Sequence, residues 1–292
     1  MKRMLVSVII ILLLVAPLSA FATDKVSDWE DFTGSLEEAR SLEDSEKAAT
    51  AITNARNIFE NAFAKQIKGF DSTKLQIHQG LNDAAQAATN SDDQGIAIGA
   101  ELAEKTTLGL VFSALQIHIE AGNAAQAHPW FDVMAKKLKL DSNHDLVKQM
   151  DRINRNPQVT KKKGAKVIDG LTGKLAGKVA EEVDEALVAA DPTSSEQDLA
   201  DAKIKAAEGV AYFRAMRSQA DQKLGLEEAA LVAGLLDQFF NANVDENYDA
   251  ALSAGTLIKQ NLEVLETSKN LSESQLGKEI DNINKGLANA AN

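Results

Sequence analysis

Two side chains with metal-binding chemistry share one face of an expected helix. Glu104 and His118 lie in the stretch 95–140, whose three- and four-residue apolar spacing predicts a long helix, a break at Gly122 and a second helix. Glu208 has a similar place on a later helix. Carboxylate oxygen and imidazole nitrogen together suit iron, manganese or zinc. We therefore predict that Glu104, His118 and Glu208 meet between packed helices and bind a divalent or ferric ion.

The same spacing has a simpler interpretation. The middle of the face is apolar, as in any helix that faces a core, and its polar ends could reach water. Glu104 and Glu208 could also pair with the adjacent lysines, Lys105 and Lys205. A buried carboxylate needs some partner, and the spacing alone does not choose between a lysine and a metal ion.

The chain carries no recognisable catalytic pattern. The zinc-protease sequence H-E-x-x-H is absent, and none of the four histidines has a nucleophile beside it in the sequence. The glycines and lysines of 170–178 do not have phosphate-loop spacing. We therefore predict a protein that is not an enzyme, with no catalytic residues and no cofactor beyond such a metal ion.

Helices must position these side chains. Alanine is abundant, only 5% of residues are aromatic, and no stretch alternates polar and apolar residues as a strand does. The sequence predicts an all-α fold, a bundle or array of helical hairpins with about eight to ten helices.

The helical pattern is interrupted once for long enough to suggest a boundary. Around Pro157 and the lysine run 161–163 the apolar periodicity stops. We predict an N-terminal half at 23–150, a linker at 151–163, a C-terminal half at 164–268 and a polar tail at 269–292.

Short echoes within the chain suggest that the halves are similar. The sequence LQIH at 75–78 recurs at 115–118, and LGLVF at 108–112 is followed 100 residues later by EGVAY at 208–212. The first offset is typical of a helical hairpin repeat. We interpret the second as the trace of an old duplication.

The first 22 residues have the pattern of a secretory signal. Lys2 and Arg3 precede an apolar stretch, and Ala20-Phe21-Ala22 is an A-x-A cleavage site. We therefore predict export to the periplasm, the extracellular space or another part of the cell envelope, with no membrane span after cleavage. The formal charge of −12 argues against nucleic acid as a partner, because phosphate backbones are bound by cationic surfaces.

Two stretches resemble a known family. The run KAAEGVAYFRA at 205–215, and the stretch from Asn61 to Asp71, are similar to the exported helical region found with prokaryotic iron permeases. The permease motif Arg-Glu-x-x-Glu is absent, and so is the G-x-H-x-x-E motif of the imelysin family. The resemblance implies an envelope protein associated with metal uptake, whose partner is a membrane permease or another envelope protein.

Two functions follow as expectations. One is a metal-uptake accessory or metal-binding protein of the cell envelope. The other is a helical scaffold that binds another envelope protein through the surfaces of its hairpins.

Overall fold

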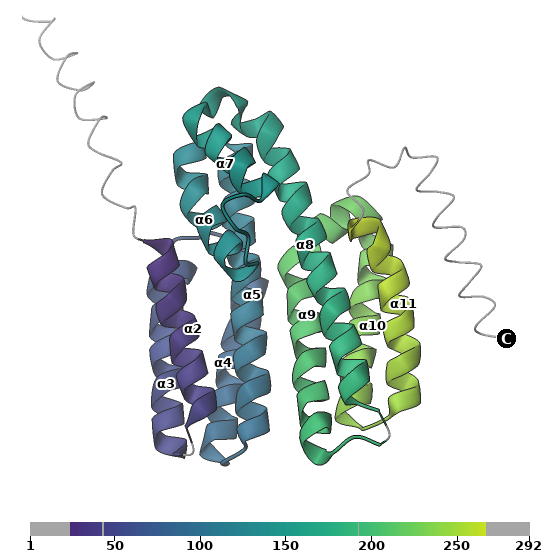
Figure 1. The fold of residues 1–292 in the computed structure, drawn as a ribbon. Helices are drawn as coiled ribbons and strands as arrows, with labels where there is room; N and C mark the ends of the chain where they lie inside the picture. The colour runs from purple at the N-terminus through teal and green to yellow at the C-terminus, as the bar shows by residue number, and fades with distance from the viewer. Residues whose placement is uncertain (1–23, 43, 192, 267–292) are drawn as a thin grey trace, which may run out of the picture.

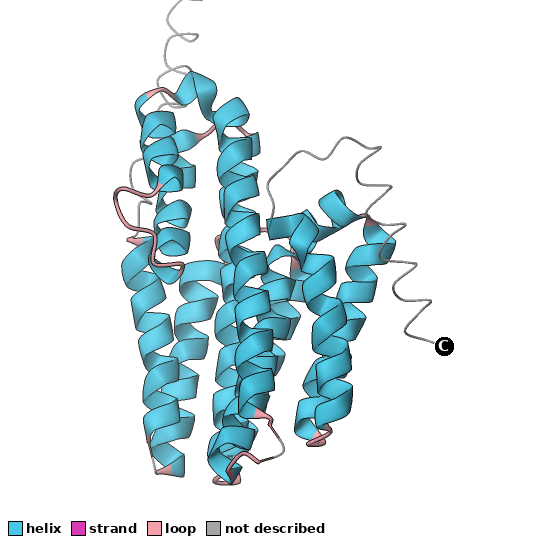
Figure 2. Ribbon diagram, turned by 45° about the vertical axis from the view of Figure 1, so that its right-hand side comes forward, coloured by secondary structure: helices cyan, strands magenta, loops and turns pink. Residues whose placement is uncertain are grey.

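The computed structural model describes residues 24–42, 44–191 and 193–266, and these residues fold as an all-α protein, which confirms the predicted fold class (Figure 2). They form ten α-helices and contain no strand. None of the described helices is long and apolar enough to cross a membrane. The predicted signal at 1–22 and the tail at 269–292 lie outside the described residues.

The first four helices form one bundle. They are α2 (Lys25–Ser41), α3 (Ser45–Ile58), α4 (Asp71–Thr89) and α5 (Asp93–Glu120), and α3 continues into the π-helical turn η2 (Phe59–Ala64). Short polar connections supply the caps: the Asp44 carboxylate accepts hydrogen bonds from the first turn of α3, and Asp92 does the same for α5. Each neighbouring pair packs side by side, and α2 closes the bundle against α5.

The last four helices form a second bundle of the same kind. They are α8 (Thr160–Ala189), α9 (Glu196–Leu224), α10 (Leu226–Val244) and α11 (Tyr248–Glu266). Ser195 and Asp198 make a reciprocal capping box at the start of α9, and Gly225, at φ +92°, turns the chain into α10. Helix α11 returns to pack on α8.

The segment between the bundles is also helical. After the predicted break at Gly122 (φ +78°), α6 (Ala124–Lys137) and α7 (Asp145–Arg155) lead through the 3₁₀ turn η3 (Pro157–Val159) into α8. Residues 151–163, predicted as a linker, thus contain the end of α7, this turn and the start of α8. The lysine run is exposed there, in the first turn of α8.

Helices α5 and α9 join the two bundles (Figure 1). They are parallel, because contacts advance in step along both: Gln94 donates to the carbonyl of Ala200, and further along, Gly109 faces Ala215. A Cβ atom on Gly109 would lie 2.6 Å from the Cα of Ala215, so glycine permits this close approach. Residues 103–112 of α5 are buried on every side, because α4, α6 and α9 surround the helix. The sequence predicted one buried apolar face for this helix, whereas in the structure every side of this segment is buried.

Candidate functional site

A cluster of buried charges lies where α5 meets α9. Glu104 and Lys105 are each 3% exposed and Glu208 is 8% exposed. Charged side chains are almost never buried to this degree unless they are paired. The cluster is therefore the place where the chain departs most from an ordinary helical core.

Lys105 is the centre of the cluster. Its Nζ lies 3.3 Å from Oε1 of Glu104 on the same helix and 3.5 Å from Oε1 of Glu208 on α9. It also forms an ion pair with Glu101, one turn before it on α5. One ammonium group thus links three carboxylates across the junction of the bundles. The aromatic ring of Tyr212, 5.9 Å from the same nitrogen, lines another side.

Two more cations reach the cluster from other helices. Arg40, near the end of α2, pairs with Glu101 and has a terminal nitrogen 3.9 Å from Glu104. Lys137, the last residue of α6, donates to Glu104. The cluster therefore connects α2, α5, α6 and α9.

A second lysine extends the cluster into the second bundle. The Nζ of Lys205 lies 3.0 Å from Glu182, 2.8 Å from Glu185 and 3.1 Å from Glu208. Glu208 is consequently shared between Lys105 and Lys205. Helix α8, which carries Glu182 and Glu185, is joined to α9 by these contacts.

Two carboxyl groups of the cluster, those of Glu182 and Glu208, have strongly shifted pKa values. Burial raises the pKa of Glu182 to about 8, and its hydrogen bond to Glu208 and the negative charge there add to the effect. Burial also opposes ionisation of Glu208, but the hydrogen bond with Glu182 and the charges of Lys105 and Lys205 outweigh it and lower the pKa of Glu208 to about 2. The two carboxyl groups therefore share one proton at neutral pH, with Glu182 as the protonated partner.

The structure brings together two of the three side chains predicted as metal ligands. Glu104 and Glu208 contact the same lysine, as described above. His118 is fourteen residues further along α5, which corresponds to about 21 Å of helix. It is half-buried, and burial lowers its pKa. The structure therefore does not bring His118 to Glu104 and Glu208, because two residues on one helix face can still lie four turns apart.

The described residues contain no group of three or more histidine, aspartate or glutamate side chains arranged to hold a metal ion. The carboxylates at the α5–α9 junction face ammonium and guanidinium groups instead. Pairing with Lys105 and Lys205, the alternative considered from sequence, is what the structure contains, although the carboxylates do not reach solvent.

Sequence reasoning missed Arg40, Lys137 and Glu182 as members of the cluster. All three come from helices other than α5 and α9, and no spacing within one helix relates them to Glu104. A signal for Lys105 was present: Lys105 and Gly109 match Lys205 and Gly209 at the same 100-residue offset as the LGLVF echo. Matched lysines inside two apolar stretches indicate that both need buried acidic partners.

Comparison with known proteins supplies the family. A family model for the iron permease FTR1 N-terminal domain matches residues 22–258. The chain belongs to this family. The match confirms the resemblance noted in the sequence and extends it far beyond the two stretches that carried it. No curated protein and no solved structure matches the chain.

The match to the iron permease FTR1 N-terminal domain includes every residue of the charge cluster. It begins before α2 and ends within α11, so the domain described by the family comprises both bundles and the helices between them. The α5–α9 junction is thus internal to one family domain.

Proposed function

We propose that this protein serves iron uptake as a non-enzymatic accessory of a membrane permease in the cell envelope. The observation that carries the proposal is the match to the iron permease FTR1 N-terminal domain over 22–258. The basic residues, apolar stretch and A-x-A site at the start of the chain support export.

The charge balance of the cluster favours a docking role over metal storage. With Glu182 protonated, the ionised carboxylates are those of Glu101, Glu104, Glu185 and Glu208, and they face the cations of Arg40, Lys105, Lys137 and Lys205. Four negative charges thus meet four positive charges. A metal ion entering there would have to displace a cation, so we infer that the cluster fixes the two bundles as one body that a permease can recognise.

Iron transport in cells tests the accessory role. We expect cells that lack this protein but keep the permease to take up radiolabelled iron at a rate at least several-fold lower, and the restored gene to recover the rate. Manganese uptake in the same cells is the control. Unchanged iron uptake, or recovery of the protein from the cytosol with its leader intact, would overturn the proposal.

A metal-binding role is the second candidate, and the gathering of buried carboxylates around Lys105 favours it. Its test is titration of the purified protein with iron, zinc and manganese. If these carboxylates are ligands, Glu104→Gln and Glu208→Gln each weaken binding at least tenfold, because a lost ligand leaves the others under-coordinated. His118→Ala, at a residue about 21 Å further along α5, should leave binding at this site unchanged. If binding is absent at micromolar metal, the docking role stands alone.

A further inference from the structure

A cavity between the two bundles is lined by two arginines. It has a volume of about 320 Å³ and lies between the start of α4, the middle of α9 and part of α10, where Ser72, Gln76 and Asp237 are exposed. That volume is at the lower end of the range for small-molecule sites. The cavity is separate from the charge cluster, and none of its lining residues belongs to that cluster.

The arginines retain free hydrogen-bond donors. The Arg214 guanidinium approaches Asp237 only to 3.9 Å, which is too long for a hydrogen bond. Arg217 donates from Nε to Asp221 at 2.7 Å, and its two terminal nitrogens have no partner among the described residues. Burial lowers the pKa of Arg214, which the charge of Asp237 only partly offsets. Asp221 thus compensates the charge of Arg217, whereas Asp237 compensates that of Arg214 only weakly, and both guanidinium groups keep free donors.

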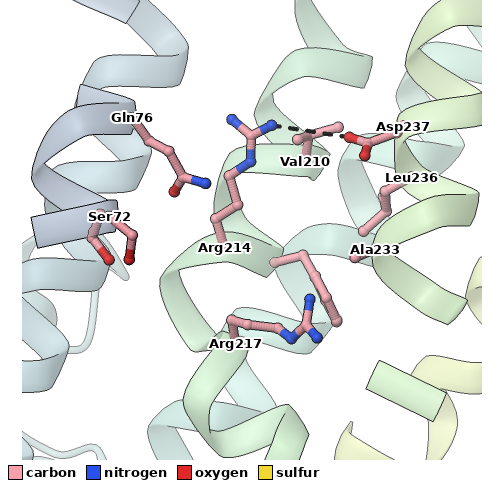
Figure 3. Close-up of a pocket in the computed structure, with 10 residues that line it drawn as sticks. Ser72, Gln76, Val210, Arg214, Arg217, Ala233, Leu236 and Asp237 are labelled. Atoms are coloured by element: carbon pink, nitrogen blue, oxygen red, sulfur yellow. Dashed lines mark ion pairs between the residues drawn. The ribbon is translucent and has the colours of Figure 1, made fainter. Parts of the chain in front are cut away.

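The opposite wall adds neutral donors. Figure 3 shows the Gln76 amide of α4 extending toward Arg214 of α9, with Ser72 one turn earlier on α4. The Gln76 amide makes no hydrogen bond to any described residue. Helix α4 also begins without a side-chain cap, since its N-cap residue is Phe70 in the left-handed region. The first backbone N–H groups of α4 are therefore available, and they favour negative charge.

Another part of the lining is apolar. Val210, Phe213 and Leu236 form this part of the wall. A cavity with a cationic side and an apolar side fits a ligand that has both an acidic group and a carbon skeleton. Guanidinium groups bind carboxylates through two parallel hydrogen bonds, which fixes the orientation of the ligand as well as its charge.

We propose that this cavity binds a small organic acid, whose carboxylate is held by Arg214 and Arg217 and whose carbon skeleton lies against Val210, Phe213 and Leu236. The ligand bridges α4 of the first bundle and α9 and α10 of the second. Binding therefore stabilises the packing of the two bundles. This inference is independent of the proposed role in iron uptake.

Calorimetric titration of the full exported chain tests the site. The probes are citrate, succinate and inorganic phosphate, each at the same ionic strength, with sodium chloride as the blank. We expect one site that binds at least one of the two organic acids below about 1 mM, several-fold more tightly than phosphate, and that raises the melting temperature as ligand is added.

Variants assign the binding to the cavity. Arg214→Gln and Arg217→Gln should each weaken binding at least tenfold, whereas Arg155→Gln, at an exposed arginine on α7, should leave it unchanged. Asp237→Asn should strengthen binding, because it removes the acid that competes for Arg214. If Arg214→Gln does not fold, Arg217→Lys serves instead, since it keeps the charge but loses the paired hydrogen bonds.

Three results would overturn the proposal. They are no binding by either organic acid at 10 mM (about 2.7 kcal/mol of binding free energy), equal loss of binding in Arg155→Gln, and phosphate binding as tight as that of the organic acids. The last result would assign the cavity to an inorganic anion, with no contribution from its apolar wall.

Discussion

The stability of the α5–α9 junction depends on individual charged residues, and Lys105 contacts more of the buried carboxylates than any other cation there. Replacing it with methionine keeps much of its volume and removes the cation that three buried carboxylates share. Uncompensated buried charge costs about 3–5 kcal/mol, so we expect Lys105→Met to lower the free energy of unfolding by that amount in urea denaturation. Lys162→Met, at an exposed lysine of α8, is the control. A loss below 1 kcal/mol for Lys105→Met would mean that the carboxylates are protonated or hydrated instead of paired (about 1 kcal/mol being the typical ceiling for an exposed pair).

The shared proton of Glu182 and Glu208 makes stability depend on pH. The folded-state pKa of Glu182, about 8, is above the ordinary pKa of 4.5 that it has in the unfolded chain. Between these values the folded protein keeps a proton that the unfolded chain loses. The contribution of Glu182 is therefore present below pH 4.5 and is lost as the pH rises through 8. Glu208 acts in the opposite sense: its contribution is present above pH 4.5 and is lost as the pH falls toward 2.

Glu182→Gln tests this assignment, because glutamine imitates the protonated carboxyl. The parent should lose stability between pH 5 and 8 with a slope no steeper than about 1.4 kcal/mol per pH unit, reduced by solvent screening, and the variant should lose less. Urea denaturation at several pH values measures both. Glu181→Gln, at an exposed neighbour paired with Lys178, should keep the parent slope. Identical slopes for parent and Glu182→Gln would place the proton elsewhere.

Among the helices, the close contact between α5 and α9 depends on Gly109, which has no side chain. A methyl group on Gly109 would lie 2.6 Å from backbone of Ala215 and could be accepted only if the helices moved apart. We expect Gly109→Ala to destabilise the protein by about 1–3 kcal/mol, although alanine favours the helix. Gly177→Ala is the matched control in α8: a Cβ there meets nothing within 4 Å, so the gain of up to about 1 kcal/mol in helix propensity should appear. If thermal denaturation showed the two variants to be equally stable, the close contact would be refuted.

At the scale of the whole molecule, the position of the weakest segment distinguishes a two-domain chain from one body. A linker at 151–163 would be cut first by trypsin at the lysines 161–163. In the structure these lysines belong to the first turn of α8, whereas Lys139 is exposed in the loop between α6 and α7, with φ +53°. We therefore expect the first cut after Lys139, because proteases favour exposed non-helical segments. Mass spectrometry of the early fragments identifies the first cut. A first cut at 161–163 would support the predicted linker between two halves.

The fold class, the approximate number of helices and the family resemblance were all predictable from the sequence alone. These are local properties: alanine content, the spacing of apolar residues, and capping residues such as Asp92 act within a few positions of the chain. The break at Gly122 was predictable for the same reason, because glycine is the residue that most readily adopts a positive φ.

The surroundings of Glu104, by contrast, depend on how the helices pack. The periodicity of α5 indicated one buried face, but contact with α4, α6 and α9 buries the middle of the helix entirely. Arg40, Lys137 and Glu182 reach the junction from distant parts of the chain, and His118 is separated from it by the rise of its own helix. A helical repeat specifies direction around the axis, whereas a binding site also requires position along the axis and partners from other helices. The partners of a buried charge are therefore set by packing, which local spacing does not encode.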